Sequence, residues 1–270
     1  MATGSTSSIE DVAEKAGGQL WLQLYLWQDR SLSHDLARRA AKAGYEALVV
    51  TADLGIGYNR EYNARNGYQN PFQLTYKTAR DMLFKPGWFT SVLLPYLVTT
   101  GPPKQANNPP AFANVHHSRL RGCDFTWDDI SKLREVWPGK LLVKGLLHPE
   151  DAAKTVECGA DGVIVSNHGG RTMDSAVAAI DALPAIVAAV GTRTTVIVDS
   201  GIRRGSDIVK ALALGAKAVM IGRATLYGTT VAGEAGVAKA LALLSREYAQ
   251  TLAYVGCRNA GELTRDVFAA

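Results

Sequence analysis

Short runs rich in valine, isoleucine and leucine alternate along this chain with amphipathic stretches, and the runs end in polar residues. Apolar runs of this kind are typical of buried parallel strands. Strands that alternate with helices indicate an α/β fold built on a parallel sheet. We predict six strands, at residues 20–26, 47–53, 140–145, 160–165, 195–199 and 218–223.

Helices are predicted between these strands. Ser8 before the acidic residues Glu10 and Asp11 is a favourable helix start, because a serine caps the first amide groups and carboxylates complement the helix dipole. Thr126 precedes a second such start. The remaining helices are predicted at residues 33–43, 148–157, 176–190, 205–214 and 232–254.

The alternation of strands and helices is interrupted after the second strand. Residues 54–129 hold seven prolines, and so long a connection is uncommon in a compact domain and usually functional. We predict an irregular insertion that serves as an active-site loop. Within it, residues 83–98 are strongly apolar and aromatic. They suit a membrane-surface patch or a lid, but we favour burial against the barrel or a neighbouring subunit.

Composition narrows the class of protein. The 270 residues are 47% hydrophobic with a net charge of +4, which fits a globular chain with one large core, either one barrel or two small domains. No block of lysine and arginine stands out, and the aromatic residues are not interleaved with basic ones, so we expect no nucleic acid partner. Scattered arginines suit an anionic substrate or a phosphate-bearing cofactor.

Cys123, Cys158 and Cys257 are far apart and lack zinc-ligand spacing, so we expect no metal site and reduced cysteines in a cytoplasmic protein. The first eight residues have no apolar core of a signal peptide, and no stretch reaches the length of a transmembrane helix.

The hexapeptide Ser166-Asn167-His168-Gly169-Gly170-Arg171 follows a predicted buried strand. In a (β/α)₈ barrel the carboxyl end of a strand is the catalytic face. A histidine three residues before an arginine, with two glycines between them, suits a base beside a cation that binds a carboxylate. The alternative is a histidine satisfied in a turn.

Other strand ends carry polar side chains. Gln23 and Tyr25 alternate with apolar residues, which fits either a strand facing a site or a half-exposed strand. Lys144 ends an apolar strand, where it either pairs with an anionic or polar group or extends to solvent. Glycines and arginines follow the last two strands, in residues 199–205 and 222–223, and predict a phosphate site.

Co-linear motifs resemble those of the FMN-dependent α-hydroxy acid dehydrogenases and oxidases. The matching stretches are Gln23-Leu24-Tyr25, Thr51-Ala52-Asp53 with Arg60-Glu61, Leu142-Val143-Lys144-Gly145, the hexapeptide 166–171, Asp199-Ser200-Gly201-Ile202-Arg203-Arg204-Gly205, and residues 211–216 leading to Gly222-Arg223. The resemblance implies a TIM-type (β/α)₈ barrel that binds FMN in one domain, residues 1–270.

The resemblance also implies residue roles. His168 would take a proton from the 2-hydroxy acid, from carbon in a carbanion route or from the hydroxyl during hydride transfer, and Asp53 would orient and stabilise its ring. Arg171, Arg60 and Tyr25 would bind the substrate, and Lys144 would stabilise the reduced flavin. The remaining cofactor contacts would come from Gln23, Thr51, Ser166, Asp199, Gly201, Arg203, Gly222 and Arg223.

The run from Arg203 to Ala216 and the run from Gly222 to Gly228 resemble most the members that oxidise mandelate. The implied reaction is oxidation of (S)-mandelate to benzoylformate, with L-lactate or a glycolate-type acid as the alternative substrate. The electron acceptor would be a quinone or oxygen, the assembly a homo-oligomer, and the location the cytoplasm or the inner face of the membrane, reached through residues 83–98.

The family pattern has two βα units, roughly 60 residues, before the position that matches Ser5. The resemblance therefore implies a barrel that is incomplete at its N-terminus, with two open sheet edges. A substrate-binding tyrosine of the family falls in that part, and Ala2 stands where the family has a serine. The alternatives to an active enzyme are a truncated, non-catalytic fragment that needs a complementing chain and a different phosphate-binding barrel enzyme.

Overall fold

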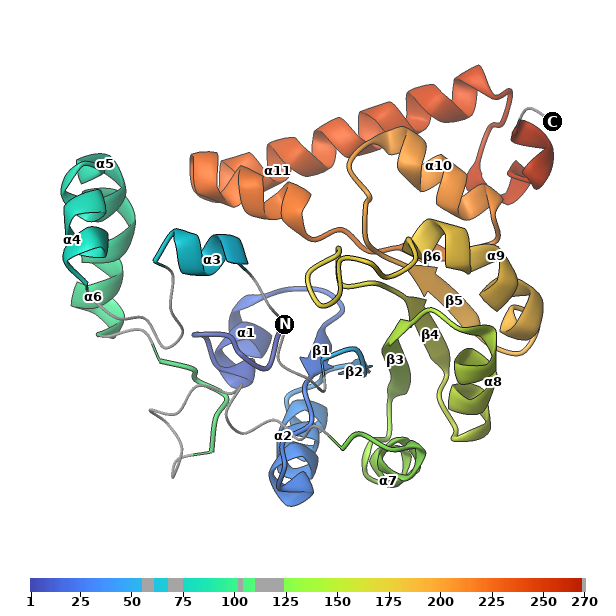
Figure 1. Ribbon diagram of the computed structural model, residues 1–270, viewed down its shortest axis with the longest axis horizontal. Helices are drawn as coiled ribbons and strands as arrows, with labels where there is room; N and C mark the ends of the chain where they lie inside the picture. The colour runs from blue at the N-terminus through green and yellow to red at the C-terminus, as the bar shows by residue number, and fades with distance from the viewer. Residues whose placement is uncertain (55–60, 68–74, 102–103, 110–123, 269–270) are drawn as a thin grey trace.

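The computed structural model describes residues 1–54, 61–67, 75–101, 104–109 and 124–268 (Figure 1). Its centre is one parallel sheet in which the six strands follow their order in the sequence. The strands are β1 (Trp21–Leu24), β2 (Ala47–Thr51), β3 (Lys140–Leu146), β4 (Gly162–Val165), β5 (Thr195–Val198) and β6 (Ala218–Val219). The predicted six-stranded α/β fold of the barrel type is confirmed, with β1 and β6 outermost.

The backbone of Met1 to Thr3 lies beside β1. The amide of Gln23 donates to the Met1 carbonyl over 2.8 Å, and the amide of Thr3 donates to the Gln23 carbonyl over 3.0 Å. These residues therefore cover part of the β1 edge with a short parallel bridge.

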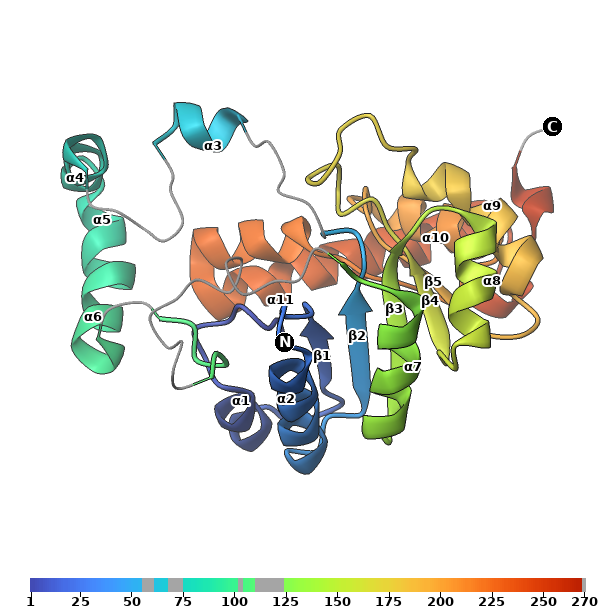
Figure 2. The same ribbon diagram turned by 60° about the horizontal axis from the view of Figure 1, so that its bottom comes forward.

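Helices line the outside of the sheet, as Figure 2 shows. The Ser8 side chain caps the first of them, as predicted, and Thr126 forms a capping box with Asp129. The helices are α1 (Ile9–Lys15), α2 (Arg30–Lys42), α7 (Trp127–Val136), α8 (Pro149–Glu157), α9 (Ala179–Val190), α10 (Gly205–Ala213) and α11 (Arg223–Tyr254). The last helix begins at Arg223, earlier than predicted, and is kinked at Ala232 and Gly233.

Alternate strand residues face two different cores. Leu48, Val50 and Val143 belong to the large core between the sheet and the helices, whereas Val49 and Ile164 belong to a smaller cluster on the other face. Because successive side chains of a strand point to opposite faces, both faces of each strand must be apolar, and this explains the uninterrupted apolar runs in the sequence.

Much of the described part of the insertion is helical, although residues 104–109 are not, so the prediction of an irregular segment is wrong for residues 61–65, 76–83 and 86–100. It contains α3 (Glu61–Arg65), α4 (Tyr76–Leu83), α5 (Pro86–Trp88), the π-helix η1 (Phe89–Leu93) and α6 (Leu94–Thr100). Pro86 and Pro95 lie in the first turns of their helices, where the missing amide hydrogen costs little. Proline density alone therefore misled the prediction.

We call residues 76–100 the insertion helices. They lie apart from the sheet in both views (Figures 1 and 2). Their large apolar side chains are exposed, including Leu83 at 76% and Val98 at 78%. The favoured prediction is burial of this segment against the barrel or a neighbouring subunit. Burial against the barrel is wrong for the described residues, and burial against a neighbouring subunit stays a prediction.

A buried asparagine fixes the chain where it leaves the insertion. Asn107 is fully buried, and its side-chain oxygen accepts from the amide of Ile9 over 3.0 Å. Its amide nitrogen donates to the carbonyls of Thr3 and Ser7. Among the helices of the described residues, none combines the length and apolarity that crossing a bilayer requires.

Candidate active site

Polar side chains from five strand ends meet at the carboxyl edge of the sheet. Gln23 in β1 donates from Nε2 to Oγ1 of Thr51 at the end of β2 over 2.8 Å. Tyr25 follows β1, and its amide donates to the Thr3 hydroxyl. The structure thus brings the first two strand ends together, as parallel pairing of β1 and β2 requires.

His168 and Asp53 form a hydrogen-bonded pair at this edge. Nδ1 of His168 lies 3.1 Å from Oδ1 and 3.3 Å from Oδ2 of Asp53. Both side chains are largely buried. A carboxylate on Nδ1 fixes the imidazole orientation and leaves Nε2 as the other ring nitrogen for proton transfer.

Gly145 makes this pairing sterically feasible. Asp53 follows β2 and His168 follows β4, so their side chains meet across β3, where Gly145 lies in a bulge with φ of +102°. A β-carbon at Gly145 would stand 2.6 Å from Cβ and 2.7 Å from Cγ of Asp53. Only a residue without a side chain leaves room for the carboxylate here.

Lys144 is buried and paired. Its Nζ lies 3.1 Å from Oδ2 of Asp199 and donates to the Ser166 hydroxyl over 2.8 Å. The side chains of Lys144 and Asp199 are 11% and 17% exposed. Of the two sequence interpretations, the one with an anionic partner is therefore confirmed.

Arg171 connects the sheet to the insertion. Its Nη1 donates to the hydroxyl of Tyr62 in α3 over 3.3 Å. Nothing in the sequence around Tyr62 marks a contact with a residue so distant in the chain. Arg60, the other predicted substrate-binding arginine, lies outside the described residues.

The ends of β5 and β6 provide open backbone and positive charge. In the described part of the chain, apart from the adjoining residues, no heavy atom lies within 4 Å of where a β-carbon would stand at Gly201 or Gly222. Arg203 and Arg223 beside them are exposed, and Arg223 also donates to the Gly169 carbonyl over 3.0 Å. Exposed amides, glycines and guanidinium groups are the elements of a phosphate site.

The charges of the site suit an anion. Lys144, Arg171, Arg203 and Arg223 carry four positive charges, against two carboxylates from Asp53 and Asp199. No group of acidic, histidine or cysteine side chains in the described part of the chain could hold a metal ion. Cys158 and Cys257 are free, and Cys123 falls outside the described residues.

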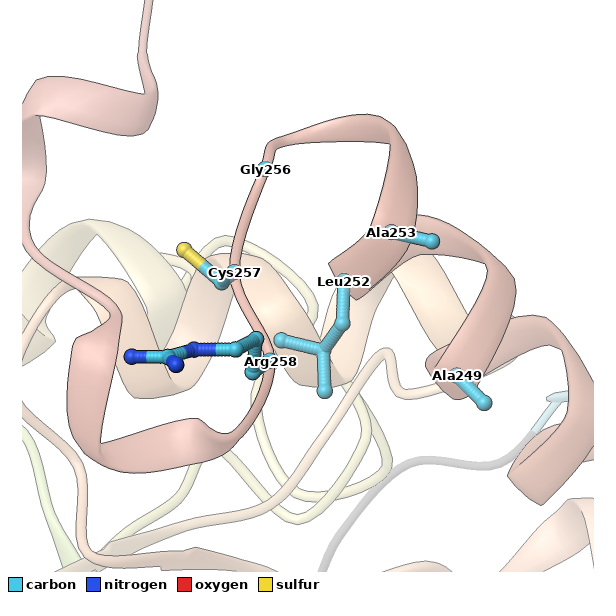
Figure 3. Close-up of a pocket in the computed structure, with 6 residues that line it drawn as sticks. All are labelled: Ala249, Leu252, Ala253, Gly256, Cys257 and Arg258. Carbon is cyan, nitrogen blue, oxygen red and sulfur yellow. The ribbon is translucent and has the colours of Figure 1, made fainter.

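An open pocket lies elsewhere, at the C-terminal end of α11 (Figure 3). Leu252, Cys257 and Arg258 are among its lining residues, and it shares none with the strand-end site. Two residues near the strand ends were missed as contacts from the sequence. Tyr62 is one, and Ser200, which receives a hydrogen bond from the Gly169 amide, is the other.

The structure combines a parallel α/β sheet of the barrel type with a histidine–aspartate pair and the elements of a phosphate site at its carboxyl edge. This combination is typical of barrel enzymes that bind a cofactor. The sequence model of the FMN-dependent dehydrogenases matches residues 1–270. The chain belongs to this family of FMN-dependent oxidoreductases, and the predicted resemblance is confirmed.

Individual relatives have several substrates in their names. The chain is 41% identical to (S)-mandelate dehydrogenase of Pseudomonas putida, covering 98% of this chain and 67% of the relative. It is 42% identical to an L-lactate oxidase of Nostoc sp., with 95% and 67% covered, and 40% identical to 2-hydroxyacid oxidase 1 of Mus musculus, with 96% and 66% covered. The chain thus spans about two thirds of the length of these relatives.

The solved structures agree with the sequence relatives. The crystal structure of a monotopic membrane protein, (S)-mandelate dehydrogenase, is 41% identical and superposes with a TM-score of 0.91 over 98% of this chain and 71% of that one. A mandelate oxidase, 35% identical, superposes with a TM-score of 0.78 over 98% of this chain and 67% of that one. The family oxidises small 2-hydroxy acids.

Proposed function

We propose that this chain oxidises an (S)-2-hydroxy acid to the 2-oxo acid with FMN, and that its substrate is (S)-mandelate. The observation that carries the proposal is the pairing of His168 with Asp53 beside the buried Lys144. A base oriented by a carboxylate, next to a fixed positive charge, suits removal of a proton while negative charge develops nearby.

The residues present fit FMN. Gly201, Arg203, Gly222 and Arg223 would hold the phosphate through open backbone and guanidinium groups. The ribityl chain and ring would be held by the polar side chains at the strand ends, namely Gln23, Thr51, Lys144, Ser166 and Asp199. When bound, the flavin supplies the acceptor for the two electrons that the substrate loses.

Each remaining residue of the site has a proposed task. His168 accepts a proton at Nε2, from carbon or from the hydroxyl, and Asp53 stabilises the imidazolium that results. Arg171 and Arg60 bind the substrate carboxylate, for which a bidentate guanidinium is better suited than an ammonium group. Tyr25 hydrogen-bonds the substrate, and Lys144 keeps positive charge beside the ring of the cofactor.

Several finer assignments belong to the same proposal. The solved (S)-mandelate dehydrogenase superposes with a TM-score of 0.91, and this supports mandelate. L-lactate or a glycolate-type acid is the alternative, because other relatives are an L-lactate oxidase and a 2-hydroxyacid oxidase. We propose a quinone or oxygen as the acceptor, a homo-oligomer, and one FMN-binding domain over residues 1–270 in which residues 54–129 serve as the active-site loop. The contact between Tyr62 and Arg171 supports that loop assignment.

The test is an absorbance spectrum of the purified chain with FMN, followed by anaerobic addition of (S)-mandelate or L-lactate. A bound flavin that (S)-mandelate bleaches faster than L-lactate supports the proposal. A chain that binds no FMN is a non-catalytic fragment and overturns it.

A histidine variant sharpens the test. His168→Ala should keep FMN but lower the rate of flavin reduction by about 10³-fold, as loss of a general base does. His34→Ala is the matched control, because His34 lies within α2 and not at a strand end. Equal rates in the wild-type chain and His168→Ala would remove His168 from its proposed role.

We further propose that the insertion helices contact the surface of a membrane containing anionic lipid. Leu83, Phe84 and Val98 are exposed, and Lys77, Arg80 and Lys85 outnumber Asp81 in the same segment. The similar (S)-mandelate dehydrogenase of known structure is a monotopic membrane protein, and this supports the proposal.

Co-sedimentation with phosphatidylcholine vesicles, with and without phosphatidylglycerol, tests this contact. The double variant Leu83→Ser, Val98→Ser should lose binding, whereas Leu226→Ser, which changes an exposed leucine of α11, should keep it. Equal binding by the double variant and the wild-type chain would argue against a membrane contact through the insertion helices.

A further inference from the structure

Two non-glycine residues among those described have a positive φ, and they lie in contacting loops. His168 has φ of 57° and Ser200 has φ of 70°. This region of backbone conformation is unfavourable for residues with a side chain, and such residues concentrate at functional sites where surrounding contacts hold them. The loops touch through the Gly169 amide, which donates to Oγ of Ser200 over 2.9 Å.

Serine hydroxyls hold the peptide groups on both sides of His168. The amide of His168 itself donates to Oγ of Ser166 over 3.1 Å, which orients the peptide group before it. The amide of Gly169 donates to Ser200, which orients the peptide group after it. The two bonds together restrain both backbone torsions of His168, and through them the direction of its imidazole.

The two serines are joined through a buried ion pair. Ser166 accepts from Nζ of Lys144 over 2.8 Å, and Lys144 pairs with Oδ2 of Asp199. The Ser200 hydroxyl donates to the other carboxylate oxygen, Oδ1 of Asp199, over 2.8 Å. The contacts therefore close a ring from Lys144 through Ser166, the His168 backbone, Ser200 and Asp199 back to Lys144.

We propose that Ser200 is a positioning residue for His168. Its hydroxyl accepts from the backbone beside the histidine and donates to the carboxylate that pairs with Lys144, so it couples the orientation of the base to the lysine at the neighbouring strand end. This inference rests on the proposed role of His168 as the base. The hydroxyl explains why a serine occupies a backbone conformation that favours glycine.

Two substitutions separate the hydroxyl from the backbone conformation. Ser200→Gly removes the hydroxyl and relieves the positive φ, whereas Ser200→Ala removes the hydroxyl and keeps the unfavourable φ. The melting temperature of Ser200→Gly should stay within roughly 3 °C of the wild-type value, because the two effects oppose each other, and that of Ser200→Ala should be lower.

Hydrogen exchange of single amides, measured by NMR on the chain without flavin or substrate, is the primary readout. In both variants the Gly169 amide should exchange about fivefold to tenfold faster, as expected for the loss of one hydrogen bond. The Gly170 amide is the internal control, because it donates to the carbonyl and the side-chain oxygen of Asn167 instead and should keep its rate.

Two outcomes would overturn the proposal. An unchanged exchange rate of Gly169 in Ser200→Gly means that the hydroxyl does not hold this amide. An equal acceleration of Gly169 and Gly170 together with a fall in melting temperature means that the serine only stabilises the loop.

Flavin reduction supplies a second readout. In Ser200→Gly the limiting rate with (S)-mandelate should fall about tenfold while the substrate concentration at half-maximal rate stays within about twofold, because the base and not the binding site is displaced. A wild-type limiting rate in a variant whose Gly169 amide is released would overturn the link to His168. A wild-type chain that reduces no flavin counts against the proposed function, and the exchange experiment still decides the role of the hydroxyl.

Discussion

Leu141 in β3 is fully buried, whereas Leu83 in the insertion helices is 76% exposed. The same contrast holds for hydrogen bonds. At the strand ends they join distant residues, such as His168 and Asp53, while in the insertion helices Thr90, Ser91 and Thr99 bond to carbonyls one turn away. The sheet therefore holds its geometry by long-range packing, whereas these hydrogen bonds in the insertion helices are local.

The first prediction tests this contrast with one substitution in each region. Leu141→Ala should lower the free energy of unfolding by about 3 kcal/mol, since it leaves a cavity in a packed core. Leu83→Ala should change it by less than about 0.5 kcal/mol, as exposed sites do. Urea unfolding of both variants measures the difference. Similar losses would show that the insertion helices are packed in solution and would contradict the contrast between the two regions.

The second prediction concerns the close approach at Gly145. Gly145→Ala should lower the free energy of unfolding by about 2 kcal/mol more than Gly18→Ala, because both residues have a positive φ but only Gly145 has Asp53 in the way. Flavin reduction should also slow, since the carboxylate must move away from His168. Equal unfolding costs for the two variants would mean that Asp53 adapts without penalty.

The third prediction concerns the contact between the regions, Arg171 with Tyr62. Arg171→Lys keeps the charge but loses the planar guanidinium, so the apparent affinity for (S)-mandelate and the turnover should each fall about tenfold. Arg193→Lys is the control and should have wild-type kinetics, because Arg193 lies three residues after the end of α9. Wild-type kinetics in Arg171→Lys would rule out a bidentate clamp on the substrate carboxylate.

The fourth and smallest effect is expected at Asp129 in α7, at the end of the insertion. Burial of Asp129 would by itself raise the pKa of its carboxyl, but hydrogen bonds from Arg30 and Thr126 outweigh it and lower that pKa below the ordinary 3.8. A carboxyl whose pKa is lowered by folding stabilises the fold above about pH 4, and this contribution is lost as pH falls through the folded-state pKa.

Asp129→Asn should therefore lower the free energy of unfolding by about 1 kcal/mol at pH 7. The difference from the wild-type chain should shrink as the pH falls below about 4. Unfolding of both chains at several pH values measures it, with the exposed Asp128→Asn as control. A difference that stays constant down to the lowest pH would show that the charge of Asp129 is not its source.

Much of the site could be located from the sequence because strand ends are a local property. The apolar runs mark β2 and β4, and the carboxyl end of a parallel strand is where a site is expected, so His168 could be singled out from its place after a strand. The pairing of Asp53 with His168 is what the family resemblance implies. Motif order then identified the family. Neither argument gives a distance between two side chains, because a distance depends on strand register and on what lies between.

From the sequence alone we could predict the order of strands and helices, the family and the set of candidate residues, because these follow from periodicity and from motifs within a few residues of each other. Only the tertiary structure decided that Asp53 reaches His168 past Gly145, that Lys144 is buried against Asp199, and that the Ser200 hydroxyl holds the backbone beside the histidine. It also decided that the insertion helices expose their apolar side chains, since burial depends on a packing partner and not on the hydrophobicity of the segment.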